Sequence, residues 1–222
     1  MSDSEEEIKE KQLKLVFVGE PNVGKTCIIR RFCYDDFTRH YSQTVGAEFY
    51  IKRVELPEKK EIVVRMSDVG GMEMKGHMLK NYLFNVNVII LVYDITDCDS
   101  FDNMAIWIEK IKEDVSDPLI AVFANKCDLE HKRAVRLDKT KKFIEQYGLH
   151  NFLMSARTGE NVNTYLTDII AKYFGITLSK SERERRNPVV TAEIIPASLP
   201  RTTPTRSSSK LSVNGNSICS IQ

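Results

Sequence analysis

The sequence predicts an α/β fold: a mostly parallel six-stranded sheet with one antiparallel edge strand and helices on both faces. Short apolar runs alternate along the chain with helical patterns, as expected when helices cross over between parallel strands. One link, Pro57 to Lys60, is too short to hold a helix. The two strands that it joins should therefore pair as an antiparallel hairpin at the edge of the sheet.

The elements follow from the spacing of apolar residues. Strands are predicted near residues 13–19, 46–56, 61–67, 86–93, 118–124 and 151–155. Helices are predicted near residues 24–33, 74–84, 100–113, 138–147 and 161–174. Ligand-binding loops of such a sheet follow the carboxyl ends of its strands, so polar motifs at those ends should meet along one edge.

Length and composition indicate one domain with two extensions. With 222 residues, 42% of them hydrophobic, the chain can build one core of roughly 150 to 200 residues. Residues 1–11 form an acidic N-terminal extension and residues 12–175 the domain. Residues 176–222, rich in Ser, Thr, Pro and Arg, are predicted to be a flexible tail.

Charge, hydropathy and cysteine usage exclude several classes of protein. The formal net charge of +1 gives no basic footprint, so nucleic acid is not an expected partner. The acidic start is the opposite of a signal peptide, and no apolar run reaches the roughly 18 residues that span a bilayer. Five cysteines without metal-type spacing indicate a reducing compartment. We therefore expect a cytosolic protein.

The run GEPNVGKT, Gly19 to Thr26, follows an apolar strand and opens a helix, which is the setting of a phosphate-binding loop. Gly19 and Gly24 allow the tight turn that points backbone N–H groups inward. The Lys25 ammonium can reach the β- and γ-phosphates, and the Thr26 hydroxyl can bind Mg²⁺. Three further residues are assigned to the same nucleotide site: Asn22 and Val23 within this run, and Cys27 directly after it.

Two motifs after later strands indicate that the base is guanine. The carboxylate of Asp128, in the run Asn125-Lys126-Cys127-Asp128, can accept the N1–H and 2-amino groups of guanine, which adenine does not offer in that arrangement. The stem of Lys126 can pack on the base plane. The run Ser155-Ala156-Arg157 closes the last strand, and the Ala156 N–H is expected to meet the guanine O6.

A further motif, Asp68 to Gly71, serves the phosphate end of the same site. Asp68 closes the predicted third strand, so its carboxylate can hold the metal through water. The Gly71 N–H should face the γ-phosphate. The only metal expected is Mg²⁺, held jointly by Thr26, Asp68 and the phosphates.

From about Leu13 to about Phe174 the chain resembles the Ras-like small GTPases, and within them the Rab branch, on the stretches from Thr44 to Phe49 and from Leu91 to Thr96. The opening MSDSEEE, the DVGG motif, the stretch Leu129-Glu130-His131 and the terminal CSIQ resemble the Rab twenty-eight subgroup. The resemblance implies that Phe37 stacks on the guanine and that Tyr41 contacts the nucleotide. It also implies that Thr44 gives Mg²⁺ a second hydroxyl and the γ-phosphate an N–H, an interaction that exists only while GTP is bound.

One departure from the family concerns catalysis. The family places a glutamine after the second glycine of its DxxG motif, where it orients the attacking water, and this chain has Met72 there. A thioether cannot donate a hydrogen bond, so we predict slow hydrolysis carried by Lys25, Thr44, the Gly71 N–H and Mg²⁺. The alternative is that another group, or a residue of a partner, positions the water.

Other departures concern recognition. Pro21 supplies no N–H beside the γ-phosphate, and we draw nothing from it. Ser67 replaces an aromatic residue of the surface that meets effectors in Rab proteins, so effector choice should be unusual. Arg157 replaces a lysine without change of charge.

The last four residues, Cys219 to Gln222, fit a C-a-a-X box with a residue that favours farnesyl. One prenyl group without a second cysteine in the tail should bind membranes reversibly, with a cytosolic pool and a prenyl-binding carrier. The expected location is the cytoplasmic face of membranes. The resemblance alone adds a link to the cilium or basal body.

The sequence therefore predicts a switch that binds GTP and GDP with Mg²⁺, recruits effectors in vesicle or ciliary trafficking and hydrolyses GTP slowly. Its partners would include an exchange factor and a GTPase-activating protein. A rival hypothesis is a GTP-binding scaffold without hydrolysis, controlled only by nucleotide exchange. A third, an ATP-using enzyme, is disfavoured by Asp128.

Overall fold

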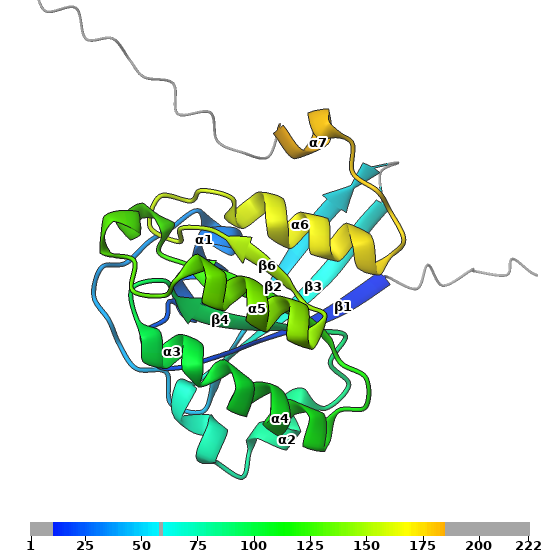
Figure 1. Cartoon of the computed structure of the whole chain (residues 1–222). Coiled ribbons are helices and arrows are strands. Elements are labelled where there is room, and N and C mark those ends of the chain that lie inside the picture. Colours follow the sequence, from blue (N-terminus) through cyan, green and yellow to red (C-terminus); the bar gives the residue numbers. More distant parts are fainter. Residues whose placement is uncertain (1–10, 58–59, 185–222) are drawn as a thin grey trace, which may run out of the picture. The chain divides into compact units, whose positions relative to one another are not determined.

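The computed structural model describes residues 11–57 and 60–184, which all lie within the first of two units of the chain, Met1–Val189. Strands and helices alternate along most of this part (Figure 1). The strands are β1 Lys11–Val18, β2 Ala47–Leu56, β3 Lys60–Val69, β4 Val88–Asp94, β5 Leu119–Asn125 and β6 His150–Leu153. The α-helices are α1 Lys25–Tyr34, α2 Leu79–Leu83, α3 Cys98–Asp102, α4 Met104–Asp114, α5 Leu137–Tyr147, α6 Val162–Tyr173 and α7 Lys180–Glu184. Two 3₁₀ helices are η2 Gly71–Lys75 and η3 Cys127–Lys132.

The strands form one six-stranded sheet in the order β2-β3-β1-β4-β5-β6. Strands β3, β1, β4, β5 and β6 are parallel, and β2 runs antiparallel to β3 at the edge. The predicted fold class is confirmed, including the edge hairpin.

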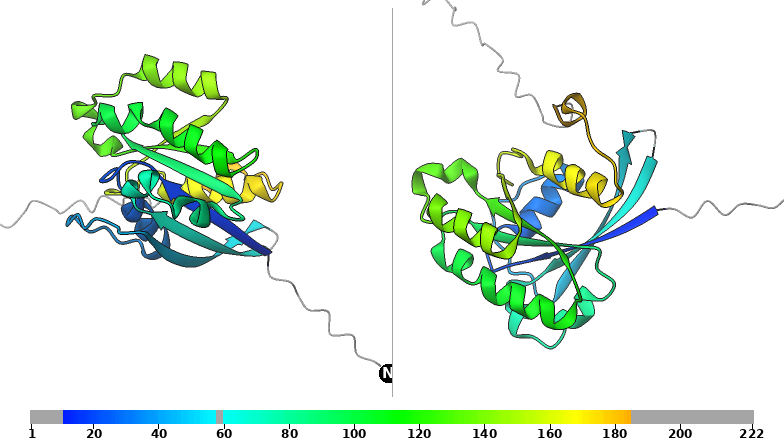
Figure 2. Two further views of the ribbon diagram at one scale, coloured as in Figure 1. Left: turned by 90° about the horizontal axis from the view of Figure 1, so that it is seen from below. Right: turned by 45° about the vertical axis from the view of Figure 1, so that its right-hand side comes forward.

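Helices cover both faces of the sheet because the side chains of each buried strand alternate in direction. On β1, Leu13, Leu15 and Phe17 pack in the core that contains residues of α1 and α6. Val16 and Val18 point to the other core, which contains residues of α2, α3 and α4 and packs against α5. Figure 2 (left) shows α4 and α5, in green, across the sheet from α1, in blue, and α6, in yellow.

The structure corrects two predicted helices. In place of one helix near 74–84 there are η2 and α2, because Gly76 has an extended backbone, with φ −86° and ψ 157°, that no helix contains. The helix near 100–113 starts earlier, since the Asp97 side chain caps α3 by accepting from the Asp99 N–H, and it divides at Asn103 into α3 and α4.

The start of the predicted tail also contains structure. Leu178 is buried in the core that includes α6, and Arg183 of α7 lies 3.1 Å from the Asp168 carboxylate of α6. The domain thus extends past Gly175. The lipidation motif at Cys219 and the acidic extension up to residue 10 lie outside the described residues. Among the helices that are described, none has the length and apolar character needed to cross a membrane.

Candidate functional site

The topology brings the predicted motifs to one edge of the sheet. Since β1, β3, β4, β5 and β6 are parallel, the loops that follow them all leave from the same edge. Strand β2 runs the other way, so the segment that precedes it, with Thr44, reaches this edge as well. The register pairs Phe17 with Asp68 and Asp94 with Asn125, which places the strand ends in a row.

The loop between β1 and α1 depends on its two glycines. Gly19 has φ +134°, and a β-carbon there would lie 2.2 Å from the Val92 carbonyl oxygen. Gly24 has φ +97°, and a β-carbon there would lie 2.3 Å from Nδ2 of Asn125. Both positions therefore require glycine, for backbone conformation and for space.

The Lys25 side chain turns back into this loop. Its ammonium donates to the carbonyl oxygens of Gly19, at 2.8 Å, and of Glu20, at 2.9 Å. Burial lowers the pKa of Lys25 to about 8, against the opposing charges of Asp68 and Glu20. A phosphate bound at the loop would supply further negative charge and favour the protonated ammonium.

The three predicted metal ligands meet in the structure, although they come from α1, the loop before β2 and the end of β3. Oγ1 of Thr26 donates to Oδ2 of Asp68 at 2.5 Å, and Oγ1 of Thr44 does so at 3.4 Å. The two threonine hydroxyls are 3.3 Å apart.

The second oxygen of this carboxylate, Asp68 Oδ1, is buried and has no hydrogen-bond partner in the described part of the chain. Burial raises the pKa of Asp68, while the bond from Thr26 and the charge of Lys25 lower it. Two hydroxyls beside a carboxylate with a free oxygen form a set of hard oxygen donors, so these residues fit Mg²⁺.

The Asp68 to Gly71 motif contacts both neighbouring loops. The Gly70 N–H donates to the Gly46 carbonyl at 2.9 Å, and a β-carbon on Gly70 would lie 2.4 Å from the Thr44 carbonyl oxygen. A β-carbon on Gly71 would lie 2.3 Å from the Pro21 nitrogen. The segment with Thr44 therefore lies directly on the motif, which lies on the phosphate loop.

Asn125 links the base end of the site to the phosphate loop. Its Nδ2 donates to the Val23 carbonyl at 2.8 Å, and its Oδ1 accepts from the Ala156 N–H at 3.0 Å. The Ala156 N–H, expected to face the guanine O6, thus already has a protein acceptor. Oγ of Ser155 donates to Oδ1 of Asp128 at 2.6 Å, which orients the carboxylate assigned to guanine.

Two cations flank this base end. Nζ of Lys126 donates to the Asn22 carbonyl at 2.9 Å and pairs with Asp94 at 2.6 Å. Arg157 lies 3.6 Å from Asp128, near enough for charge attraction.

Cys127 lies between Lys126 and Asp128 in the sequence. Burial, with the neighbouring Glu160 carboxylate, raises the pKa of its thiol to about 12, so the thiol stays protonated.

These segments enclose a cavity of about 500 Å³. The predicted residues that line it are Asn22, Gly24, Lys25, Thr26, Cys27, Phe37, Tyr41, Thr44, Gly71, Asn125, Lys126, Asp128, Ala156 and Arg157. Gly19, Val23, Asp68 and Ser155 lie behind this lining and hold it in place through the interactions described above.

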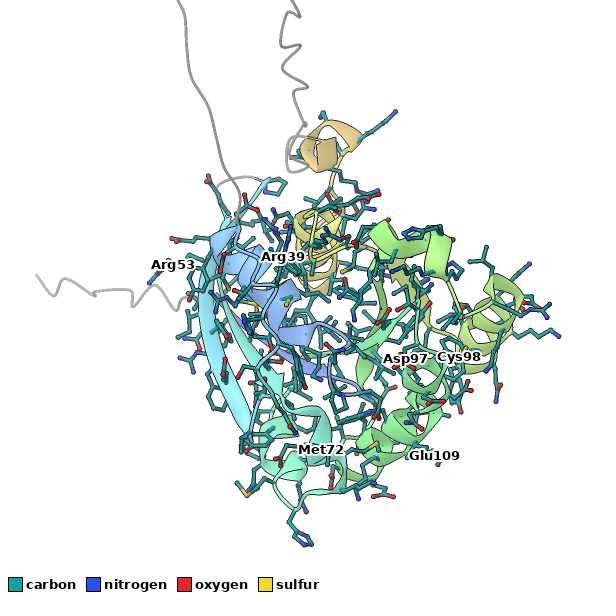
Figure 3. The ribbon with its side chains drawn as sticks, turned by 90° about the vertical axis from the view of Figure 1, so that its left-hand side faces the viewer. Arg39, Arg53, Met72, Asp97, Cys98 and Glu109 are labelled. Carbon is teal, nitrogen blue, oxygen red and sulfur yellow. The ribbon has the colours of Figure 1, made fainter. Side chains whose placement is uncertain are left out.

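Met72 is the predicted site residue that belongs neither to this lining nor to the residues that hold the lining in place. It lies in η2, and the residue is 57% exposed. Figure 3 shows Met72 apart from Arg39, which does line the cavity.

Several residues of the site were not predicted. Arg39 and His40 line the cavity, Asp94 pairs with Lys126, and the Glu20 carboxylate accepts from Nε1 of the buried Trp107 at 3.2 Å. Arg31 of α1 contacts the loop that holds Ala156 and Arg157. Of these residues, only Asp94 could have been predicted from the sequence, because it ends an apolar strand as Asn125 does.

Comparison of the sequence with known proteins identifies the family of this chain. Residues 14–174 match the family model described as "Ras family". The chain is 31% identical over 198 residues to a protein named Ras-related protein Rab-28 from Caenorhabditis elegans, an alignment that covers 87% of this chain and 80% of the relative. It is 38% identical over 167 residues to Ras-related protein Rab-13 from Mesocricetus auratus, covering 73% and 82%. It is 36% identical over 181 residues to Ras-related protein Rab-10 from Caenorhabditis elegans, covering 79% and 89%. With a six-stranded sheet, a phosphate loop and this family match, the chain belongs to the Ras family of small GTPases.

Proposed function

We propose that this protein is a Rab-type GTPase, a switch that binds GTP and GDP with Mg²⁺ and hydrolyses GTP slowly. The observation that carries the proposal is the meeting of Thr26, Thr44 and Asp68 beside the Lys25 ammonium. Three oxygen donors and a buried cation at a phosphate loop suit a metal-bound triphosphate better than any other ligand.

At the phosphate end, the Thr26 and Thr44 hydroxyls and Asp68, through water, would hold Mg²⁺. When bound, this ion would neutralise charge on the β- and γ-phosphates. Lys25 binds the same phosphates, and the Gly71 N–H donates to the γ-phosphate. The reaction transfers the γ-phosphoryl group to water and leaves GDP and phosphate.

The switch would be the segment that precedes β2. Thr44 contacts Asp68, and Gly46 accepts from Gly70. In the GTP form these interactions would be reinforced by the γ-phosphate and the metal ion. Loss of the γ-phosphate removes that support and releases the segment, which effectors would sense.

Guanine would be selected by Asp128, which Ser155 orients, with Lys126 packed on the base and Phe37 against its edge. Replacing Asp128 by Asn should move the preference from guanine toward xanthine nucleotides, because an amide offers the complementary donor. Competition of GDP and xanthosine diphosphate for the purified variant measures this. An unchanged preference would contradict the assignment of the base.

The decisive experiment is single-turnover conversion of preloaded GTP with Mg²⁺, followed by chromatography of the bound nucleotide. Met72→Gln is compared with the parent, and Met78→Gln is the matched control, since Met78 is also a half-exposed methionine but is not part of the cavity lining. We expect slow conversion by the parent and by Met78→Gln, and conversion at least about tenfold faster by Met72→Gln, about 1.4 kcal/mol of barrier.

Equal rates for the parent and Met72→Gln would mean that another group orients the water. A parent that binds no guanine nucleotide would contradict the whole proposal.

The second candidate is a GTP-binding scaffold controlled only by exchange. The position of Met72 favours it, because an exposed thioether outside the cavity lining does not orient a water. The same experiment separates the two. Slow but measurable conversion supports the switch, and GTP that persists unchanged supports the scaffold.

Membrane attachment completes the proposal. A farnesyl group on Cys219 would give reversible binding to the cytoplasmic face of membranes, with a cytosolic pool kept soluble by a prenyl-binding carrier. The Rab relatives support a role in vesicle traffic with effectors, an exchange factor and a GTPase-activating protein. Resemblance to Rab twenty-eight is the reason to look for the protein at the cilium, by imaging it alongside Cys219→Ser.

A further inference from the structure

Arg31 lies on α1, behind the cavity, and its guanidinium contacts two separate segments of the site. Nε donates to the Ala156 carbonyl at 3.1 Å, and Nη2 donates to the Arg157 carbonyl at 2.9 Å. Nη1 donates to the carbonyl of Asp35 at 2.8 Å and to its carboxylate at 2.9 Å. One side chain therefore joins the loop after β6 to the residue where α1 ends.

The first of these hydrogen bonds fixes the orientation of a peptide in the cavity lining. In a trans peptide the N–H points opposite to the C=O. Because the Ala156 carbonyl points at Arg31, the Arg157 N–H on the same peptide plane points away from it. Ala156 and Arg157 both line the cavity at the end that holds Asp128.

The hydrogen bonds to Asp35 hold the start of the loop that carries Phe37. Asp35 ends α1 in the left-handed conformation, with φ 53°, which is uncommon for a residue other than glycine. Its N–H donates to the Arg31 carbonyl at 3.0 Å, so Arg31 holds Asp35 through both backbone and side chain. Phe37, two residues later, lines the cavity.

From this geometry we infer that Arg31 is a positioning residue that holds both walls of the base-binding end together and so slows the release of guanine nucleotide. The inference rests on the proposed function, since it concerns the base of that nucleotide. The side chain is 14% exposed, whereas the Asp35 carboxylate is 76% exposed, so the bonds to carbonyls matter more than the ion pair. A lysine could not replace the guanidinium fully, because it has one donor group in place of a fork.

The test is the release of N-methylanthraniloyl-GDP, chased with unlabelled GDP in Mg²⁺, from the purified full-length parent and its variants. We expect Arg31→Ala to release it at least about tenfold faster than the parent, a difference of about 1.4 kcal/mol. Arg31→Lys should lie between the two. Asp35→Asn, which removes the charge of the exposed carboxylate but keeps the backbone carbonyl and tolerates the left-handed conformation, should release the labelled GDP at close to the parental rate.

Arg133→Ala is the control for stability. The Arg133 side chain is 13% exposed and, like that of Arg31, pairs with a nearby carboxylate, that of Glu130, but neither Glu130 nor Val135, whose carbonyl also accepts from Arg133, belongs to the cavity lining. The Arg133→Ala variant should have a lower midpoint of thermal unfolding than the parent but should release the labelled GDP no faster.

Two readouts distinguish positioning from a general loss of stability. The preference for GDP over ADP in competition should fall in Arg31→Ala, because the peptide near the base is no longer held. The factor by which EDTA accelerates release should stay parental, because Thr26 and Asp68 are untouched.

Parental release and parental GDP preference in Arg31→Ala would overturn the inference while leaving the proposed function intact. The inference would also be wrong if Asp35→Asn reproduced the full effect, because the exposed ion pair would then be the cause. If Arg31→Ala does not fold, Arg31→Lys decides, and a parental rate in that variant overturns the inference. A parent that binds no labelled GDP overturns both.

Discussion

Replacing Asn125 by Ala removes the side chain that joins the phosphate loop to the base end of the site. The Val23 carbonyl and the Ala156 N–H lose their partner while they remain in a buried region. A buried polar group left without a partner costs about 1 to 3 kcal/mol, so the two together should lower the free energy of unfolding by about 2 to 6 kcal/mol. The whole free energy of unfolding of a domain is about 5 to 15 kcal/mol, so this loss is large.

The assay is urea unfolding followed by circular dichroism. Since bound nucleotide adds stability that depends on its concentration, unfolding is measured at several GDP concentrations and extrapolated to none. The control is Asn81→Ala, whose exposed amide contacts only the Met78 sulfur among the described residues; it should stay within about 0.5 kcal/mol of the parent. The reasoning is refuted if Asn125→Ala unfolds within about 0.5 kcal/mol of that control.

Three further predictions follow from single features of the chain. Gly24→Ala should weaken binding of labelled GDP at least about tenfold, because its β-carbon would lie 2.3 Å from Asn125 Nδ2 at φ +97°; titration with parental affinity would contradict this. Trp107→Phe should lower the free energy of unfolding by about 1.5 to 3 kcal/mol, since it leaves the Glu20 carboxylate without the indole N–H, and urea unfolding unchanged from the parent would argue against that bond. Cys219→Ser should incorporate no labelled farnesyl group and should move to the soluble fraction in vesicle flotation; equal flotation of variant and parent would rule out the lipid anchor.

The sequence determined the order of strands and helices and the chemistry of the loops, because both depend on residues close together in the chain. A short apolar run bounded by polar residues marks a buried strand, and the short link at Pro57 permits only a hairpin. Gly19 and Gly24 were expected to permit a tight turn, and both have positive φ in the structure. The meeting of Thr26 with Asp68 followed from the rule that parallel strands present their loops at one edge.

The tertiary structure alone decided which side chains support those loops. Arg31 looks in the sequence like any arginine on a helix, and its role depends on α1 lying against the loop after β6. The extended backbone at Gly76 divided a predicted helix, and Met72 in the first of the two pieces is exposed outside the cavity. Interactions between residues distant along the chain depend on how whole elements pack, and no local pattern of apolar or polar residues records that packing.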